Sequence, residues 1–131
     1  MPDIVHPITS DDGTLTPDSP IELLTSLCIE ASDAAQRPMY LAPKYKDYFE
    51  RAGFVDVIEH RFKWSLNEWP KDSCYKEIGA WTRENLHTGM DGLLLALFTR
   101  FLGWSSEEVT VFSAEVRAAL KDRTVHGYIP M

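Results

Sequence analysis

The residues best suited to binding or chemistry gather between Lys63 and Trp81, in the stretch KWSLNEWPKDSCYKEIGAW. This stretch holds three of the four tryptophans of the chain. Trp69 could form one wall of a pocket for a flat molecule, because an indole ring offers a large apolar face. Lys71 and Tyr75 follow closely and could supply further contacts. We therefore take Trp69, Lys71, Tyr75 and Trp81 as candidate substrate-binding residues.

The same stretch also has a purely structural interpretation. Pro70 rigidifies a turn between a strand and a helix, and Asp72 can cap that helix and interact favourably with its dipole. We favour the cap for Asp72, whereas Trp69 suits a pocket wall and a structural position equally well. Trp64 lies on the expected strand and is assigned to the core.

A candidate acid–base group lies on the helix that follows. Glu77 and Trp81 are four residues apart and therefore share a helix face, and His87 comes next along the chain. An imidazole beside a carboxylate could act as general acid and base in an enolisation or ring closure. Arg100 could bind a carboxylate or enolate oxygen. His87, Glu77 and Arg100 are thus the catalytic candidates. The alternatives are a solvated Glu77, a surface or core-satisfied His87 and an internal salt bridge of Arg100.

Asp11 and Asp12 form an acidic pair directly before Gly13. Two neighbouring carboxylates could raise a pKa. Such a pair before glycine is more typical of a turn, and we favour that interpretation.

The histidines and cysteines do not follow a metal-binding pattern. The sequence contains no HxxxH, HxH or CxxC spacing, so no metal ion is expected. Cys28 and Cys74 are expected to be free, buried thiols. The four histidines are His6, His60, His87 and His126.

Composition indicates one globular domain over residues 1–131. The formal net charge of −7 argues against general binding to nucleic acid or anionic membranes, which needs clustered Lys and Arg. The first residues lack the basic and apolar regions of a signal peptide, and the longest apolar run is too short to span a bilayer. A cytoplasmic protein is expected.

Helical periodicity predicts about five helices. The first begins at Ser19 and Pro20 and ends before Pro38, and the second covers residues 43–52. Asp72 or Ser73 starts a third that runs to about Leu86, and residues 87–92 (HTGMDG) break it. The next covers residues 93–102 (LLLALFTRFL), is apolar nearly all round and should be buried. The last starts at a capping box of Ser105 and Glu108.

Two strands complete the prediction, so the fold class is α+β and mostly helical. Residues 54–64 (FVDVIEHRFKW) alternate with apolar residues on both faces, and residues 123–131 form a second strand. A strand that is apolar on both faces normally lies inside a larger α/β sheet. Two strands alone make only a marginal sheet. The architecture therefore indicates that part of a sheet is missing.

Several long stretches resemble, in order, the C-terminal half of the fungal class I S-adenosylmethionine (SAM)-dependent methyltransferases of the LaeA-like group. They are DDGTLTPDSP, YFERAGFVDVIEHRFKWSLNEWPKD, YKEIGAW, FTRFLGWSSEEVTVFSAEVRAALKDR and VHGY. The resemblance covers nearly the whole chain. It departs from the family at Gln36-Arg37, where the family often has Gly-Arg.

The resemblance implies which part of that fold is present. Residues 3–5 look like the end of the family's fifth strand, and the two predicted strands look like the sixth and part of the seventh. No glycine-rich turn follows a strand, so we expect this chain alone to bind neither SAM nor another cofactor. The two strands would then be a remnant of the methyltransferase sheet.

Three functions remain open at this stage. The first is a cofactor-independent cyclase or isomerase acting on a polyketide or terpenoid intermediate. The second is a non-catalytic module that pairs with itself or with another methyltransferase-like chain through exposed sheet edges. The third is a fragment of a SAM-dependent methyltransferase. A small-molecule intermediate and a homodimer are the expected partners.

Overall fold

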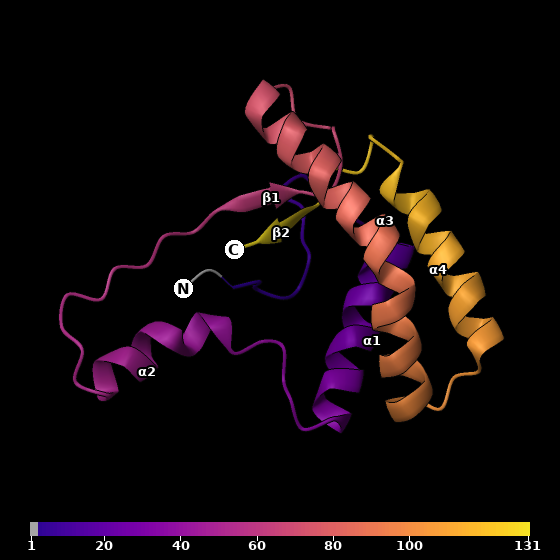
Figure 1. Cartoon of the computed structure of the whole chain (residues 1–131). Helices are drawn as coiled ribbons and strands as arrows, with labels where there is room; N and C mark the ends of the chain where they lie inside the picture. Colours follow the sequence, from indigo (N-terminus) through magenta and orange to yellow (C-terminus); the bar gives the residue numbers. More distant parts are fainter. Residues whose placement is uncertain (1–2) are drawn as a thin grey trace.

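The computed structural model describes residues 3–131 and shows a helical layer beside a small sheet (Figure 1). Four α-helices, one short 3-10 helix and two strands are present in this part of the chain, which confirms the mostly helical α+β class. In chain order they are α1 (Pro20–Ala34), η1 (Ala42–Lys44), α2 (Tyr45–Arg51), β1 (Lys63–Ser65), α3 (Ser73–Phe101), α4 (Ser106–Leu120) and β2 (Tyr128–Pro130).

Three helices begin at the expected caps. The Ser19 side chain accepts from the Ile21 N–H before α1, and Asp72 accepts from the N–H groups of Cys74 and Tyr75 before α3. The capping box of Ser105 and Glu108 is complete at the start of α4. These side chains satisfy N–H groups that no helical carbonyl can reach, and each such cap stabilises a helix by about 1 kcal/mol.

The break expected at residues 87–92 is wrong, because α3 runs unbroken for 29 residues. Leu86, Met90 and Leu94 lie four residues apart and all contribute to the core, so the apolar face continues through the two glycines. Each glycine costs a helix only about 1 kcal/mol, which packing of this face outweighs. Two expected helices are therefore one, and this lowers the helix count from about five to four.

The core lies where α1, α3 and α4 pack together. Phe98 is fully buried, and its ring meets those of Trp104 and Phe112 at centroid distances of 5.2 and 6.1 Å. The expectation that residues 93–102 are buried all round is wrong. Leu94 and Phe98 face the core, while Leu93 and Phe101 are 53% and 43% exposed because α1 and α4 both cover the other side of α3.

The sheet has β2 at its centre. β1 and β2 are antiparallel, with Trp64 opposite Ile129, and residues 5–9 run along the other edge of β2. The Val5 N–H donates to the Pro130 carbonyl at 2.8 Å, and Thr9 and Tyr128 exchange hydrogen bonds. Of residues 3–5, which resemble the end of the family's fifth strand, Val5 thus lies beside β2.

The strand predicted over residues 54–64 is wrong for most of its length. Only Lys63–Ser65 forms a strand, and Val55 and Ile58 are 83% and 76% exposed instead of buried. A strand needs a hydrogen-bonding neighbour, and within residues 3–131 the pairing with the C-terminal segment stops at Phe62 and Met131. Trp64 is also 42% exposed, because Ser65 and not Trp64 faces α3.

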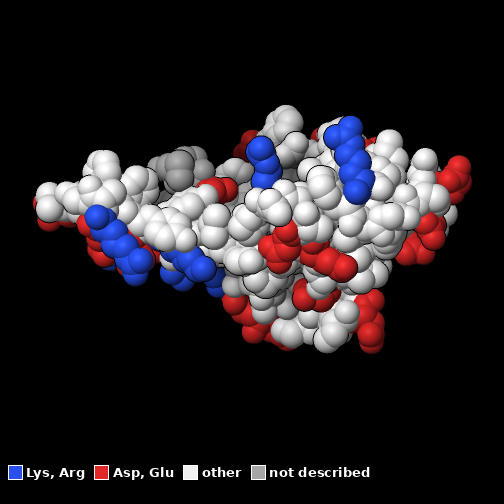
Figure 2. All heavy atoms as spheres, turned by 90° about the horizontal axis from the view of Figure 1, so that it is seen from below, with Lys and Arg blue, Asp and Glu red and all other residues white. Residues whose placement is uncertain are grey.

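Residues 42–62 form an arm that stands away from the helical layer. Among the elements of the described chain, α2 has close contacts only with η1. Seen from below, the arm is a narrow projection from the wide helical body (Figure 2). The hydroxyl of Tyr45 ties it to the N-terminal segment by donating to Asp3 at 2.6 Å. None of the helices in the described residues is long and apolar enough to cross a membrane.

The close packing of α3 on the residues that follow β1 leads to a prediction about stability. A Cβ at Gly79 would lie 1.9 Å from the Asn67 carbonyl oxygen, whereas a Cβ at Gly92 would meet nothing within 4 Å. We expect Gly79→Ala to lower the free energy of unfolding by about 1–3 kcal/mol or more, since backbone must move. Gly92→Ala should raise it by about 0.5–1 kcal/mol. Urea unfolding of both variants measures this, and equal effects would contradict the close packing.

Candidate functional site

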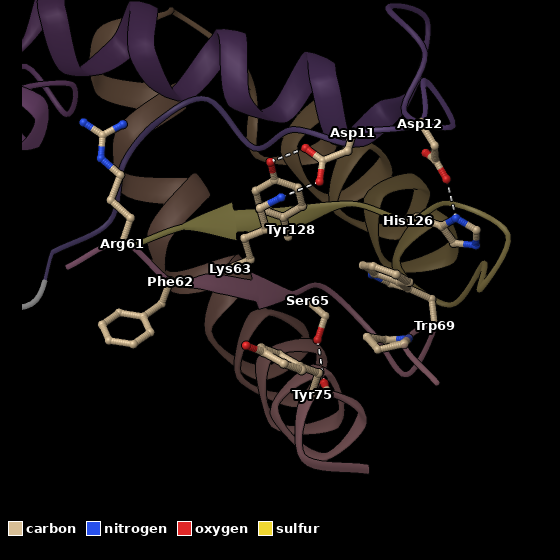
Figure 3. Close-up of a pocket in the computed structure, with 11 residues that line it drawn as sticks. Asp11, Asp12, Arg61, Phe62, Lys63, Ser65, Trp69, Tyr75, His126 and Tyr128 are labelled. Carbon is tan, nitrogen blue, oxygen red and sulfur yellow. Dashed lines mark hydrogen bonds and ion pairs between the residues drawn. The ribbon is translucent and has the colours of Figure 1, made fainter. Parts of the chain in front are cut away.

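A pocket of about 590 Å³ lies beside the two strands, and we call it the sheet pocket (Figure 3). Three segments distant in sequence build it: the N-terminal loop, β1 with the turn after it, and the C-terminal residues around β2. Aromatic rings make up much of its wall, and charged side chains lie at both ends. Its lining residues are Asp11, Asp12, Arg61, Phe62, Lys63, Ser65, Trp69, Pro70, Tyr75, His126 and Tyr128.

One end of the pocket holds a carboxylate between a phenol and an ammonium. The Tyr128 hydroxyl donates to Asp11 Oδ1 at 2.8 Å, and Lys63 donates to Asp11 Oδ2. Lys63 Nζ also lies 4.7 Å from the centre of the Tyr128 ring. Hydrogen bonds from Lys63 and Tyr128 lower the pKa of Asp11, and the bond to Asp11 raises the pKa of Tyr128.

The other end holds a histidine–carboxylate pair. His126 Nδ1 lies 2.5 Å from Asp12 Oδ2, and the His126 backbone N–H donates to Thr14 Oγ1 at 2.8 Å. Hydrogen bonds from Thr14 and then His126 lower the pKa of Asp12 to about 2. The idea that Asp11 and Asp12 raise a pKa together is therefore wrong. Each has its own donors, and the favoured turn is present at Gly13, whose φ is 74°.

Trp69 forms the wall next to His126. The two rings are 4.9 Å apart between centroids, with planes inclined by 31°. Trp69 Nε1 donates to the Gly127 carbonyl at 2.9 Å, so the polar edge of the indole is satisfied. The Trp69 N–H donates to Oδ1 of the buried Asn67. The indole is thus held rigidly and can offer its face to a planar molecule.

The structure brings only two of the predicted site residues to this pocket. Trp69 and Tyr75 line it, and the Tyr75 carbonyl accepts from Ser65 Oγ at 2.7 Å. Lys71 is exposed and does not line the cavity. Trp81 is 70% exposed on α3.

The three catalytic candidates lie along α3 and do not meet. Glu77, His87 and Arg100 are all exposed, and 23 positions of unbroken helix separate the first from the last. At 1.5 Å per residue that is about 35 Å. The His87 carbonyl accepts from Arg117 Nε at 3.1 Å, which links α3 to α4. A catalytic role for any of these residues stays a prediction. The three could share one site only if α3 bent or unfolded between them.

Nine of the eleven lining residues were not among the sequence candidates, and they include Asp11, Asp12, His126 and Tyr128, which form the side-chain contacts at the two ends of the pocket. The sequence suggested for Asp11 and Asp12 either a carboxylate pair that raises a pKa or a turn, and neither prediction places them in a pocket. His126 and Tyr128 share a face of the strand predicted over residues 123–131, but the contact between Asp12 and His126 joins residues 114 positions apart. No local pattern in one sequence reveals such a contact.

The thiols and possible metal ligands have ordinary surroundings. Burial raises the pKa of Cys28 to about 11, which leaves it an unreactive thiol. Cys74 is exposed in the first turn of α3, so its expected burial is wrong. Residues 3–131 contain no group of three His, Cys, Asp or Glu side chains that could hold a metal ion.

The residues described here do not fit SAM. Its usual cradle is a glycine-rich turn that joins a parallel strand to a helix. Within residues 3–131 the sheet is antiparallel, and Gly79 and Gly127, the glycines whose Cβ position is blocked, pack against Asn67 and Leu66 instead of opening a cradle. No chemical step through SAM is therefore assigned to these residues.

The chain is similar to fungal proteins that are named as methyltransferases or as regulators of secondary metabolism. Methyltransferases and LaeA-like regulators are both among the proteins to which the chain is similar, and it matches only part of the length of each.

Three relatives illustrate the match. The chain is 34% identical over 131 residues, its whole length, to the probable methyltransferase tdiE of Emericella nidulans, and covers 41% of that protein. It is 37% identical to the methyltransferase pytC of Aspergillus terreus over 94% of the chain and 38% of pytC. It is 32% identical to the secondary metabolism regulator LAE1 of Cochliobolus heterostrophus over 90% of the chain and 39% of LAE1. The chain thus spans about two fifths of the length of these relatives. No family model and no solved structure matches it.

The Asp12–His126 pair makes a pH prediction. The folded-state pKa of Asp12, about 2, is below its ordinary value of 3.8. The carboxylate therefore stabilises the fold above the ordinary pKa, and this contribution is lost as the pH falls through the folded-state pKa. We expect Asp12→Asn to destabilise the protein above about pH 4. The difference from wild type should shrink towards pH 2. Urea unfolding across this range tests it, and a pH-independent difference would refute it.

Proposed function

We propose that this chain forms the substrate-binding part of a methyltransferase-like protein of fungal secondary metabolism. In this proposal the sheet pocket binds a planar polyketide or terpenoid intermediate. The observation that carries the proposal is the aromatic-walled cavity of about 590 Å³ in the portion shared with methyltransferase relatives. Its volume falls in the range of small-molecule sites, about 300–1,000 Å³.

The wall of the pocket suits a flat molecule with a few polar groups. The face of Trp69 and the ring of Tyr75 offer apolar surface, and Phe62 extends it towards the arm. Lys63 adds a positive charge that a phenolate or enolate oxygen could share with Asp11. Sites that orient a small substrate usually have an apolar wall with a small number of convergent polar groups.

A second candidate is catalysis without a cofactor, as a cyclase or isomerase. The Asp12–His126 pair supports it, because a carboxylate on Nδ1 holds the imidazole with its Nε2 lone pair available as a base. His126 would take a proton from carbon next to a carbonyl and return it at another carbon. Lys63 would stabilise the enolate between these steps. The proton balance closes within the pocket and needs no redox partner.

Trp69 provides a test of binding. In calorimetric titrations with the planar probes indole and naphthol, we expect Trp69→Ala to weaken binding by about tenfold. That corresponds to about 1.4 kcal/mol, the scale of one lost aromatic contact. Trp81→Ala is the matched control, because Trp81 is 70% exposed and lies outside the pocket lining. Equal affinities in the two variants would overturn the pocket assignment.

His126 provides a test of catalysis. Incubation with enolisable polyketide intermediates in the absence of SAM should accelerate isomerisation or ring closure, and His126→Gln should abolish that acceleration. His87→Gln should leave it unchanged if the pocket is the site. A reaction rate equal to the uncatalysed rate would leave binding as the only function of the pocket.

Binding of SAM is tested separately. Calorimetry is expected to show no binding of SAM to the purified chain, and micromolar binding would overturn that expectation.

A further inference from the structure

The even-numbered positions of residues 54–62 have a pattern that is self-complementary about Ile58. The sequence is FVDVIEHRF, with phenylalanine at both ends. Asp56 and His60 lie two residues to either side of the centre, so an acidic group mirrors an imidazole. Such a pattern is complementary to itself when two copies run in opposite directions.

This segment is open to a partner along its whole length. Phe54 and Phe62 are 60% and 59% exposed, and Ile58 is 76% exposed. These three are the even positions, which share one face of an extended chain. Among the hydrogen bonds of the described residues, none involves the N–H groups of residues 55–61. Apolar side chains and unbonded N–H groups thus occur together.

We propose that two copies of this chain pair through residues 54–62 as antiparallel strands, with a two-fold axis at Ile58. In this register Ile58 faces Ile58 of the second copy, Asp56 faces His60, and Phe54 faces Phe62. Directly opposite residues in an antiparallel pair lie on the same face of the sheet. All three apolar positions and both Asp56–His60 pairs would then lie together on one face.

The direction of the backbone groups near β1 supports this register. Phe62 exchanges both of its backbone hydrogen bonds with Met131, so its N–H and carbonyl point towards the β2 side. The groups of neighbouring residues alternate in direction. If the strand continues, Val55, Val57, Glu59 and Arg61 therefore point to the free edge. These are the residues that must bond across the two-fold axis when Ile58 lies on it.

Pairing requires one local change in the backbone. Asp56 has a φ of 55°, a conformation that non-glycine residues adopt infrequently. Asp56 would leave it when the arm becomes extended. The arm has room for this change because α2 is not packed on the helical layer. A second copy explains the mirror pattern, which a different partner would not require. The pairing face shares Phe62 with the wall of the sheet pocket, but the inference does not rest on the proposed function, because its experiments measure mass and cross-linking.

The first experiment measures the mass of the full chain by size-exclusion chromatography with light scattering. We expect a concentration-dependent dimer of twice 14.9 kDa. Ile58→Lys should reduce the mass to that of one chain, because it places two ammonium groups at the axis. Val111→Lys is the matched control, since Val111 is 61% exposed on α4 and should leave the dimer intact. Circular dichroism checks that both variants stay folded. A monomeric wild type, or a dimeric Ile58→Lys variant, would overturn the proposal.

The second experiment tests the register by cross-linking in a Cys74→Ser background, which removes the exposed thiol. Ile58→Cys should form a disulfide-linked dimer, because Cα atoms of a directly opposed, non-hydrogen-bonded pair are about 4.5 Å apart. Val55→Cys should not, since the two Val55 positions would be about 20 Å apart along the strands. Equal cross-linking of both variants would refute the Ile58 axis.

Exchanging the side chains at positions 56 and 60 distinguishes a specific Asp56–His60 contact from non-specific hydrophobic association of the arm. His60→Asp should weaken the dimer, because two carboxylates would face each other in both symmetric pairs. The double variant Asp56→His with His60→Asp restores complementary pairs and should recover the dimer. A double variant no better than His60→Asp would contradict the pairing of these residues.

Discussion

The buried side chain of Asn67 is the contact on which the rest of the structure depends. Its amide nitrogen donates to the Leu120 and Asp122 carbonyls at 3.1 and 3.0 Å, and its oxygen accepts from the Trp69 N–H. One side chain thus joins the end of β1, the end of α4 and the turn before α3. Its own carbonyl also occupies the space that a side chain at Gly79 would need. An unpaired amide at this depth would cost about 1–3 kcal/mol per lost partner.

The sheet pocket follows from this junction. With the turn after β1 held in place, Trp69 reaches the Gly127 carbonyl and stacks on His126. The N-terminal loop then closes the site, because Asp11 and Asp12 bond to side chains of the C-terminal segment. Three distant parts of the chain meet there, and each has a polar partner. Both proposed functions rest on a rigid aromatic wall with the Asp11–Lys63 ion pair at one end and the Asp12–His126 contact at the other.

The molecule combines a well-packed part with an arm that packs against little. The helical layer buries its apolar face around Phe98, whereas residues 54–62 leave phenylalanine, valine and isoleucine side chains in solvent. The chain spans about two fifths of the length of its relatives, so those proteins contain further residues outside the matched region. An exposed apolar arm and an unfilled sheet edge are consistent with a surface that another chain covers.

The sequence by itself determined the local features. The caps at Ser19, Asp72 and Ser105, the core face of α4 and the family resemblance all depend on neighbouring residues or on long matched stretches. Tertiary structure alone decided whether α3 breaks, because burial of Met90 outweighs two weak glycines. It also decided that residues 54–62 lack a strand partner and that Asp12 meets His126. Packing and pairing between distant segments carry no local signal, which is the physical reason why one sequence could not reveal them.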